Sequence, residues 1–350
     1  MIFPKHDFEK TSCKDANVEK GMLVDLFDKI NDDAINVHSL MLIKDGAKVF
    51  DAYAYEQTPE THDNVFSVSK SFTSLAIGML IDRKLLSVTD LIWPFFKEEV
   101  PNPSDHYKKL TVQHLLTMSA GQARDYSDLA NEQTNPIEVF FSGDVQHEPG
   151  THFMYNNLCS FILSAIVTKI THENLNDFLD HELYQPLGIE KPIWKNWGPY
   201  AFGASGLRLT LNDMGRFGLL LLNEGMWESK QIVSAEYIKE ATSYHISTNN
   251  CDKEQDRFGY GYQFWINDFG DYRCSGLFNQ QIIINRRFNS VFVFKAYTED
   301  PLLGLFSNYV LPAMEKGWLY DNFTLRHYTQ RFHDASKTLI EQEKETRTLY

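Results

Sequence analysis

Residues 67–80 read SVSKSFTSLAIGML and combine a polar entry with an apolar helical repeat. Apolar side chains at positions 72, 75, 76, 79 and 80 recur every three or four residues, which predicts a helix buried along one face. Ser67 and Lys70 stand at the start of this helix. Because residues three apart share one helical face, the Lys70 amine can reach the Ser67 hydroxyl.

This Ser-x-x-Lys sequence is the only one in the chain, and its residue types suit nucleophilic catalysis. A serine hydroxyl needs a neighbouring base, and a lysine that is desolvated in a cleft can lose its proton and serve as one. The positive end of the helix dipole favours negative charge that develops near Ser67. The alternative is a helix-capping serine followed by a solvated lysine.

A second polar group, Tyr155-Asn156-Asn157, follows the turn Glu148-Pro149-Gly150 and opens an apolar segment over residues 158–170. A tyrosine beside a cation can exchange protons, and an asparagine amide can orient a lysine and a substrate carbonyl. The alternative for Tyr155 is an aromatic side chain that only covers the entrance of an amphipathic helix.

The remaining pattern places strand-forming sequence at both ends of the chain and helical sequence between them. A helix is predicted over residues 17–30, and an Asp-Gly turn predicts a hairpin over residues 39–53. Residues 260–266, 271–274, 280–285 and 291–297 predict further antiparallel strands, and residues 301–315 a closing helix. Together they predict an α/β (α+β) fold, with an antiparallel sheet flanked by N- and C-terminal helices and an inserted, mostly helical subdomain.

The boundaries follow from this order of elements. We expect one domain over residues 15–320, with an α/β part over about 15–75 and 215–320 and a helical part over about 76–214. Residues 321–350 form a C-terminal extension whose sequence fits either a docked helix or a loose tail.

Composition and charge exclude several classes of function. The 350 residues carry a net charge of -14, which disfavours nucleic acid as a partner. No apolar run reaches the roughly 18 residues of a membrane span, and the first residues lack the apolar core of a signal peptide. The four cysteines are widely scattered, which predicts reduced thiols and a cytoplasmic location. The oligomeric state stays open.

The chain resembles the serine β-lactamase and penicillin-binding protein superfamily, in particular its class C-like serine hydrolases. The similar segments occur in the family's order between about residues 20 and 315, and they are FSVSKSFTS (66–74), LLSVTD (85–90), LTVQHLLTMSAG (110–121), PG (149–150) with YNN (155–157), GASGL (203–207), GLLLL (218–222) and GYG (259–261). This resemblance implies a β-lactamase/transpeptidase-like fold and hydrolysis of an ester or amide through an acyl-enzyme.

Roles follow residue by residue from that resemblance. Ser67 would be the acylated nucleophile, Lys70 its proton acceptor, Tyr155 the acid/base and Asn157 the orienting amide, with Tyr260 as a wall of the substrate pocket. The resemblance implies no cofactor and no metal, and the expected substrate is a small ester, amide or peptide-like molecule.

The third family motif, normally Lys or His followed by a small residue and Gly, reads Cys274-Ser275-Gly276 here. A neutral thiol offers no charge to a substrate carboxylate. Gly276 still allows close approach to substrate, and the amides of Ser67 and Leu277 match the family's oxyanion-hole positions. A β-lactamase or D-alanyl-D-alanine carboxypeptidase, and a catalytically silent scaffold, therefore stay open beside an esterase or amidase.

Overall fold

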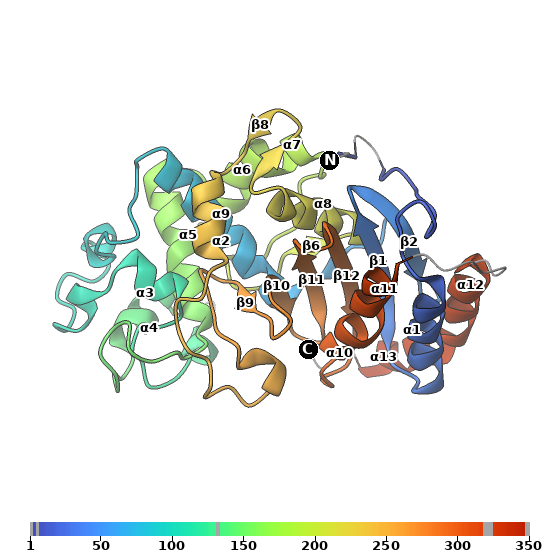
Figure 1. Cartoon of the computed structure of the whole chain (residues 1–350). Coiled ribbons are helices and arrows are strands. Elements are labelled where there is room, and N and C mark those ends of the chain that lie inside the picture. Colours follow the sequence, from blue (N-terminus) through green and yellow to red (C-terminus); the bar gives the residue numbers. More distant parts are fainter. Residues whose placement is uncertain (1–2, 5–6, 131–133, 318–324, 347–350) are drawn as a thin grey trace. The chain divides into compact units, whose positions relative to one another are not determined.

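The N-terminal hairpin forms as the Asp-Gly turn predicts. In the computed structural model, strand β1 (Val37–Lys44) pairs antiparallel with β2 (Ala47–Tyr53), and Lys44 lies opposite Ala47 (Figure 1). The two turn residues, Asp45 and Gly46, have φ values of 55° and 87°. A two-residue turn with positive φ at both positions has the twist that antiparallel strands require, which explains the tight connection.

The hairpin extends into a larger antiparallel sheet with the strand order β2-β1-β12-β11, in which β11 spans Gln280–Asn285 and β12 spans Ser290–Ala296. Side chains alternate between the two faces. Val291 faces helix α8 (Leu211–Leu222), close to Gly218, whereas Phe292 meets Phe306 with ring centroids 5.9 Å apart. Since both faces are covered, every residue of β11 and β12 is buried, and the polar alternation of a solvated sheet is absent from these two strands.

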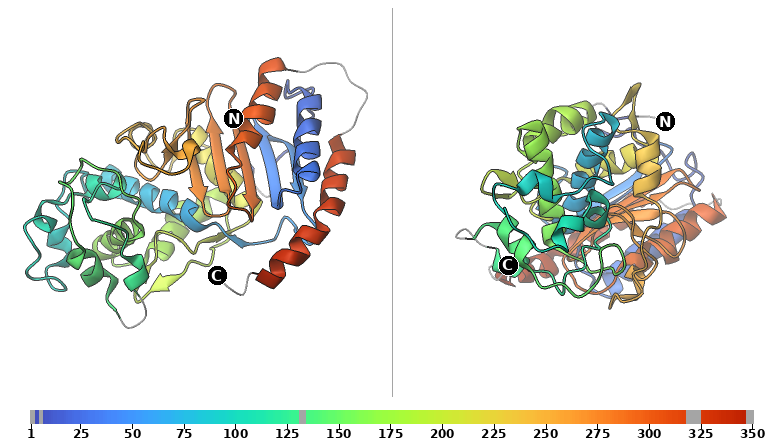
Figure 2. Two further views of the ribbon diagram at one scale, coloured as in Figure 1. Left: turned by 90° about the horizontal axis from the view of Figure 1, so that it is seen from below. Right: turned by 90° about the vertical axis from the view of Figure 1, so that its left-hand side faces the viewer.

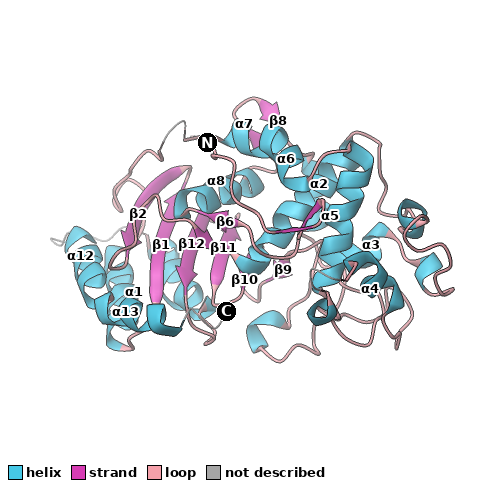
Figure 3. Ribbon diagram, turned by 180° about the vertical axis from the view of Figure 1, so that it is seen from behind, coloured by secondary structure: helices cyan, strands magenta, loops and turns pink. Residues whose placement is uncertain are grey.

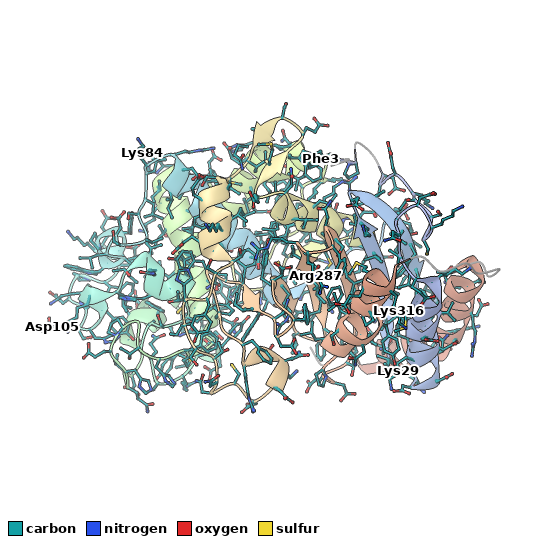
Figure 4. The ribbon with its side chains drawn as sticks, in the orientation of Figure 1. Phe3, Lys29, Lys84, Asp105, Arg287 and Lys316 are labelled. Atoms are coloured by element: carbon teal, nitrogen blue, oxygen red, sulfur yellow. The ribbon has the colours of Figure 1, made fainter. Side chains whose placement is uncertain are left out.

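The face that carries Phe292 is covered by helices from both ends of the chain. They are α1 (Lys20–Asp32), α10 (Leu303–Leu305), the π-helical η7 (Phe306–Val310) and α11 (Leu311–Lys316). Phe27 of α1 stacks edge-on against Phe50 of β2 at 5.5 Å. Charged side chains such as Lys29, Arg287 and Lys316 lie on the outside (Figure 4).

The C-terminal extension is docked where the structure describes it. Helices α12 (Leu325–Ala335) and α13 (Lys337–Thr346) follow each other, and α12 packs on α1 and β2 (Figure 2). Phe332 contacts Phe27, and the buried Glu343 carboxylate pairs with His38 of β1. Of the two possibilities for this segment, a docked helix is therefore confirmed over residues 325–346.

The structure describes residues 3–4, 7–130, 134–317 and 325–346 and divides the chain into two compact units. Unit 1 contains the sheet and comprises Met1–Asp63, Leu209–Asn223 and Ser275–Tyr350; unit 2 comprises Asn64–Arg208 and Glu224–Cys274. The mixed fold with an antiparallel sheet and an inserted helical part is confirmed. In the described residues no helix is long and apolar enough to cross a membrane.

Unit 2 is mostly helical (Figure 3). Its helices are η1 (Phe66–Val68), α2 (Ser69–Asp82), η2 (Trp93–Phe96), η3 (Tyr107–Lys109), α3 (Val112–Leu116), η4 (Ser127–Leu129), α4 (Pro136–Ser142), α5 (Asn157–Thr171), α6 (Leu175–Leu179), η5 (Asp180–Tyr184), α7 (Gln185–Leu187), α9 (Ala235–Ala241) and η6 (Glu254–Asp256). Its short strands are β4 (Asn196–Trp197), β5 (Tyr200–Ala201), β7 (Met226–Trp227), β8 (Lys230–Gln231) and β9 (Trp265–Ile266). Strands β3 (Asp63–Asn64), β6 (Arg208–Leu209) and β10 (Tyr272–Gly276) lie where the chain changes units.

Two predictions need correction. The strand predicted over residues 260–266 is present only as β9, because Gln263 has a φ of 69° and the Gly261 amide donates to the Phe264 carbonyl at 2.8 Å. The aromatic residues at positions 260, 262 and 264 are all buried, so they form core rather than one face of a strand. Residues 224–274 belong to unit 2, whereas the sequence placed them in the α/β part.

Glycine permits the close approach of α8 to the sheet, and this makes a testable prediction. A Cβ at Gly218 would lie 2.4 Å from a Val291 methyl group. Although alanine favours helices over glycine by about 1 kcal/mol, we expect Gly218→Ala to lower the free energy of unfolding by about 1–3 kcal/mol through overpacking. Urea denaturation measures this.

Gly304→Ala is the matched control, because its added Cβ would meet the Asn308 side chain at 3.3 Å. Its stability should not fall, and it should rise by up to about 1 kcal/mol from the higher helix propensity of alanine. Equal effects of the two substitutions would contradict the close packing of α8.

Candidate active site

Ser67 lies in a tight turn that leads into α2. It is half-buried within η1, and the residue before it, Phe66, has a φ of 46°, a left-handed conformation that costs a residue with a Cβ about 1–2 kcal/mol. Two side chains hold this turn. The Asn64 carboxamide accepts the Phe66 amide at 2.9 Å, and the Ser69 hydroxyl donates to the Phe66 carbonyl at 2.5 Å. The turn places Ser67 at the positive end of the α2 dipole.

Lys70 is buried on the first turn of α2, with 1% of its surface exposed. Its Nζ donates to the Ser67 hydroxyl at 3.1 Å, to Asn157 Oδ1 at 2.7 Å and to the Ala204 carbonyl at 2.8 Å. Burial lowers the pKa of Lys70 to about 7, although the Asp125 carboxylate opposes this shift. The reading of Lys70 as a solvated lysine is therefore wrong, and its amine is available as a base near neutral pH.

The two asparagines of the second motif have different partners. Asn156 caps α5, where its side chain accepts the Leu158 amide at 2.9 Å. Asn157 is the first residue of α5, and its Oδ1 faces the Lys70 amine while its Nδ2 donates to Asp125 at 2.7 Å. The helix start thus positions Asn157 against Lys70.

Tyr155 completes the cluster beside an aromatic wall. The Lys70 Nζ lies 4.8 Å from the centre of the Tyr155 ring, and the Ser67 side chain is near enough to the Tyr155 hydroxyl to lower its pKa, against the larger effect of burial. Trp265 stacks on Tyr155 at 5.6 Å, and the buried Tyr260 meets both rings. Burial raises the pKa of Tyr155, so the phenol keeps its proton at neutral pH.

The third motif, residues 274–276, is divided between the two units, and its cysteine is buried. Cys274 is 1% exposed and lies next to Ser71, and burial raises the pKa of its thiol to about 12. Ser275, Gly276 and Leu277 belong to unit 1, where the Ser275 hydroxyl accepts the Gln281 amide at 2.8 Å. Unit 2 therefore brings together Ser67, Lys70, Tyr155, Asn157 and Tyr260, while substrate binding by residues 274–277 stays a prediction.

Sequence reasoning did not single out two residues that build the site. The Asp125 carboxylate accepts the Asn157 amide. The buried Gln263 side chain joins two helices, because it accepts from Ser160 of α5 and donates to the Leu115 and Leu116 carbonyls of α3. The Asp-x-Ser sequence at Asp125 is a turn signal. Nothing in it points to a partner 32 residues further along the chain.

Arg273 of β10 contacts Trp265 and is held by other partners, so it does not replace the Lys or His that the third family motif normally has. Its guanidinium pairs with Asp256, donates to Asn267 Oδ1 at 2.7 Å and lies 5.7 Å from the centre of the Trp265 ring. Across the described residues, no group of three His, Cys, Asp or Glu side chains has an arrangement that could hold a metal ion.

The fold and this cluster define a Ser-Lys-Tyr protein of the β-lactamase type. The family model described as Beta-lactamase matches residues 23–301, and the chain therefore belongs to the beta-lactamase family. Among curated proteins, it is 24% identical over 172 residues to protein flp of Staphylococcus aureus (strain MW2), a match that spans 45% of this chain and 34% of that protein. The chain thus matches about a third of the length of this relative.

Solved structures share the fold at low identity. The octameric penicillin-binding protein homologue from Pyrococcus abyssi has a TM-score of 0.65 and 22% identity, covering 84% of this chain and 77% of its own. The D-amino acid amidase from Ochrobactrum anthropi SV3 has a TM-score of 0.66 and 14% identity, covering 85% and 98%. These similarities establish the β-lactamase/transpeptidase-like fold.

The buried amine predicts a pH-dependent stability. The unfolded chain holds the Lys70 proton up to an ordinary pKa of about 10.4, whereas the folded protein releases it at about 7. Between these values the unfolded state binds more protons, so folding becomes more favourable as the pH rises, by at most about 1.4 kcal/mol per pH unit. We expect Lys70→Met to lose this contribution in urea denaturation across that range.

Lys84→Met is the control, because Lys84 is an exposed lysine just after α2 (Figure 4). It should keep the pH dependence of the wild type. An identical pH dependence in wild type and Lys70→Met would show that Lys70 does not titrate in this window.

Proposed function

We propose that the protein is a serine hydrolase that cleaves an ester or amide through an acyl-enzyme on Ser67. The observation that carries this proposal is the buried Lys70 amine, which lies 3.1 Å from the Ser67 hydroxyl and has a pKa lowered to about 7. A serine at its free pKa is a poor nucleophile and needs such a base. Membership of the beta-lactamase family supports the same chemistry.

In the acylation step, the Ser67 oxygen attacks the substrate carbonyl carbon while its proton passes to the Lys70 amine. The carbonyl becomes a tetrahedral oxyanion, which the Ser67 amide and, by family resemblance, the Leu277 amide would stabilise. Collapse of this intermediate breaks the bond to the leaving group. The proton then moves from Lys70 to the leaving oxygen or nitrogen, directly or through the Tyr155 hydroxyl, which lies near Ser67.

Deacylation reverses these roles with water as the nucleophile. The neutral Lys70 amine, with Tyr155 beside it, takes a proton from water as the water oxygen attacks the acyl carbon. The bond to Ser67 breaks and its oxygen recovers a proton from Lys70. Asn157 holds the amine in place throughout by accepting its hydrogen bond at 2.7 Å.

Substrate preference follows from charge and burial. The Cys274 thiol is neutral because burial raises its pKa to about 12, and it cannot pair with a substrate carboxylate. The negative Asp125 lies beside Asn157. We therefore propose a neutral or weakly charged ester or amide, and the name of the similar D-amino acid amidase agrees with an amide.

Two alternatives rest on the third motif. A β-lactamase or D-alanyl-D-alanine carboxypeptidase would have to bind its carboxylate without the family's cation. A catalytically silent scaffold would explain the loss of that cation, but the intact contacts among Ser67, Lys70, Tyr155 and Asn157 speak against it.

We also propose a cytoplasmic location from the cysteine usage. All four cysteines, at positions 13, 159, 251 and 274, are free thiols. Free thiols are typical of reducing compartments.

The nucleophile can be tested directly. We expect a fluorophosphonate probe to label the wild type on Ser67, and Ser67→Ala to lose both this label and hydrolysis of p-nitrophenyl acetate, because no other hydroxyl replaces the attacking oxygen. Intact-mass and peptide mass spectrometry measure the adduct. Ser87→Ala, in the loop after α2, is the control and should label like the wild type. Labelling of folded Ser67→Ala would refute the assignment.

The relative rates of acylation by a penicillin and by a neutral ester distinguish the two substrate classes. With Cys274 in place of the cation, we expect benzylpenicillin to acylate Ser67 about 10- to 150-fold more slowly than a neutral activated ester of similar size, since a charged hydrogen-bond partner contributes about 1.5–3 kcal/mol. Time-resolved intact-mass spectrometry compares the two rates. Fast, stable penicillin adducts would favour the β-lactamase or carboxypeptidase alternative.

A further inference from the structure

Asp125 lies directly behind the Asn157 side chain in unit 2. Its Oδ2 accepts the Asn157 amide nitrogen at 2.7 Å and the Ser127 hydroxyl at 2.8 Å, and its Oδ1 accepts the Ser127 backbone amide at 3.0 Å. Both oxygens of the carboxylate are therefore engaged, and the carboxylate is held in place by the turn that starts η4.

This contact decides which end of the Asn157 amide faces Lys70. An asparagine side chain has one accepting and one donating end, a carboxylate only accepts, and a lysine mainly donates. With Nδ2 on Asp125, Oδ1 points at the Lys70 Nζ at 2.7 Å. The reversed amide would set oxygen against oxygen and N–H against N–H, so Asp125 excludes it.

Asp125 also contributes charge. The groups that face Lys70 are Ser67 and the Tyr155 ring, Asn157 and Cys159 of α5, and the Ala204 carbonyl, with Asp125 behind Asn157. Burial raises the pKa of both Tyr155 and Cys159, which leaves them neutral. The Asp125 carboxylate favours the protonated form of Lys70 and opposes the effect of burial.

We propose that Asp125 is a positioning residue, which orients the Asn157 amide toward Lys70 and, through its negative charge, favours the protonated Lys70 ammonium. This inference rests on the proposed function for its effect on catalysis. The orientation and the charge are properties of the folded protein and can be measured without turnover.

Removing the charge has two separable effects. Without Asp125 the Lys70 amine loses its proton at lower pH, so the acid limb of the rate profile moves to lower pH. At the same time Asn157 no longer holds the amine in one geometry, so the plateau of the acylation rate falls. A role limited to holding the fold would reduce the amount of active protein without moving the acid limb.

The experiment uses the full chain as wild type, Asp125→Asn, Asp125→Glu and Asp128→Asn. Asp128 is the matched control, because it lies three residues away in the same turn and its carboxylate pairs with Arg124 at 2.7 Å. The second-order rate of fluorophosphonate labelling is recorded against pH. The titration of Lys70 itself is followed by NMR of protein with ¹³Cε-labelled lysine, with its signal assigned through Lys70→Met.

We expect Asp125→Asn to lower the Lys70 midpoint and the acid limb by about half a pH unit or more, and to reduce the plateau by about tenfold or more. Asp128→Asn should match the wild type in both. Asp125→Glu keeps the charge but moves the carboxylate, so its midpoint should stay near that of the wild type while its plateau falls.

Unchanged Lys70 midpoints in Asp125→Asn would overturn the electrostatic part, and an unchanged plateau in both Asp125 variants would overturn the positioning part. If Asp125→Asn does not fold, Asp125→Glu tests the positioning role, because an unaltered plateau of the labelling rate in that variant contradicts the proposal. If the wild type is not labelled on Ser67, the proposed function fails, while the NMR midpoints of Lys70 still decide the role of Asp125.

Discussion

The structure of unit 2 depends on the burial of one amine. Lys70 has lost its contact with water, and a buried amino group is tolerated only if its hydrogen bonds are satisfied and its charge is small. Three acceptors meet its Nζ: the Ser67 hydroxyl, the Asn157 amide and the Ala204 carbonyl. They come from three segments far apart in the sequence, so the folding of each is tied to the same atom.

The neighbouring packing serves to keep those acceptors in place. The loop that carries Ala204 approaches α5 closely at Gly203, where a Cβ would lie 2.8 Å from the Ser160 carbonyl, and the Thr73 hydroxyl of α2 donates to the Gly203 carbonyl at 2.8 Å. The Gln263 side chain also links α3 to α5, because it is hydrogen-bonded to Leu115 of α3 and to Ser160 of α5. Fully satisfied buried polar networks of this kind rigidify a core, because each unmade hydrogen bond would be costly.

Much of the fold could be predicted, because its signals are local. The start of α8 is one such local signal: Thr210 and Asp213, three residues apart, form a capping box, in which the Asp213 amide donates to the Thr210 hydroxyl at 3.1 Å. The helix after Ser67 and the hairpin at Asp45 are also local patterns. The strand predicted over residues 260–266 was wrong because aromatic residues suit both strands and buried turns. Tertiary contacts, such as those of Tyr260 with Phe153 and Trp265, decide between the two.

By itself, the sequence determined the fold class and the helix starts near Ser67 and Asn157, because these follow from short-range spacing, and its motifs resembled those of the β-lactamase family. Only the tertiary structure decided that the Lys70 amine is buried and has its pKa lowered to about 7, that the Cys274 thiol is buried, and that Asp125 orients Asn157. The physical reason is that desolvation and hydrogen-bond direction depend on atoms from distant parts of the chain, which a linear pattern does not specify.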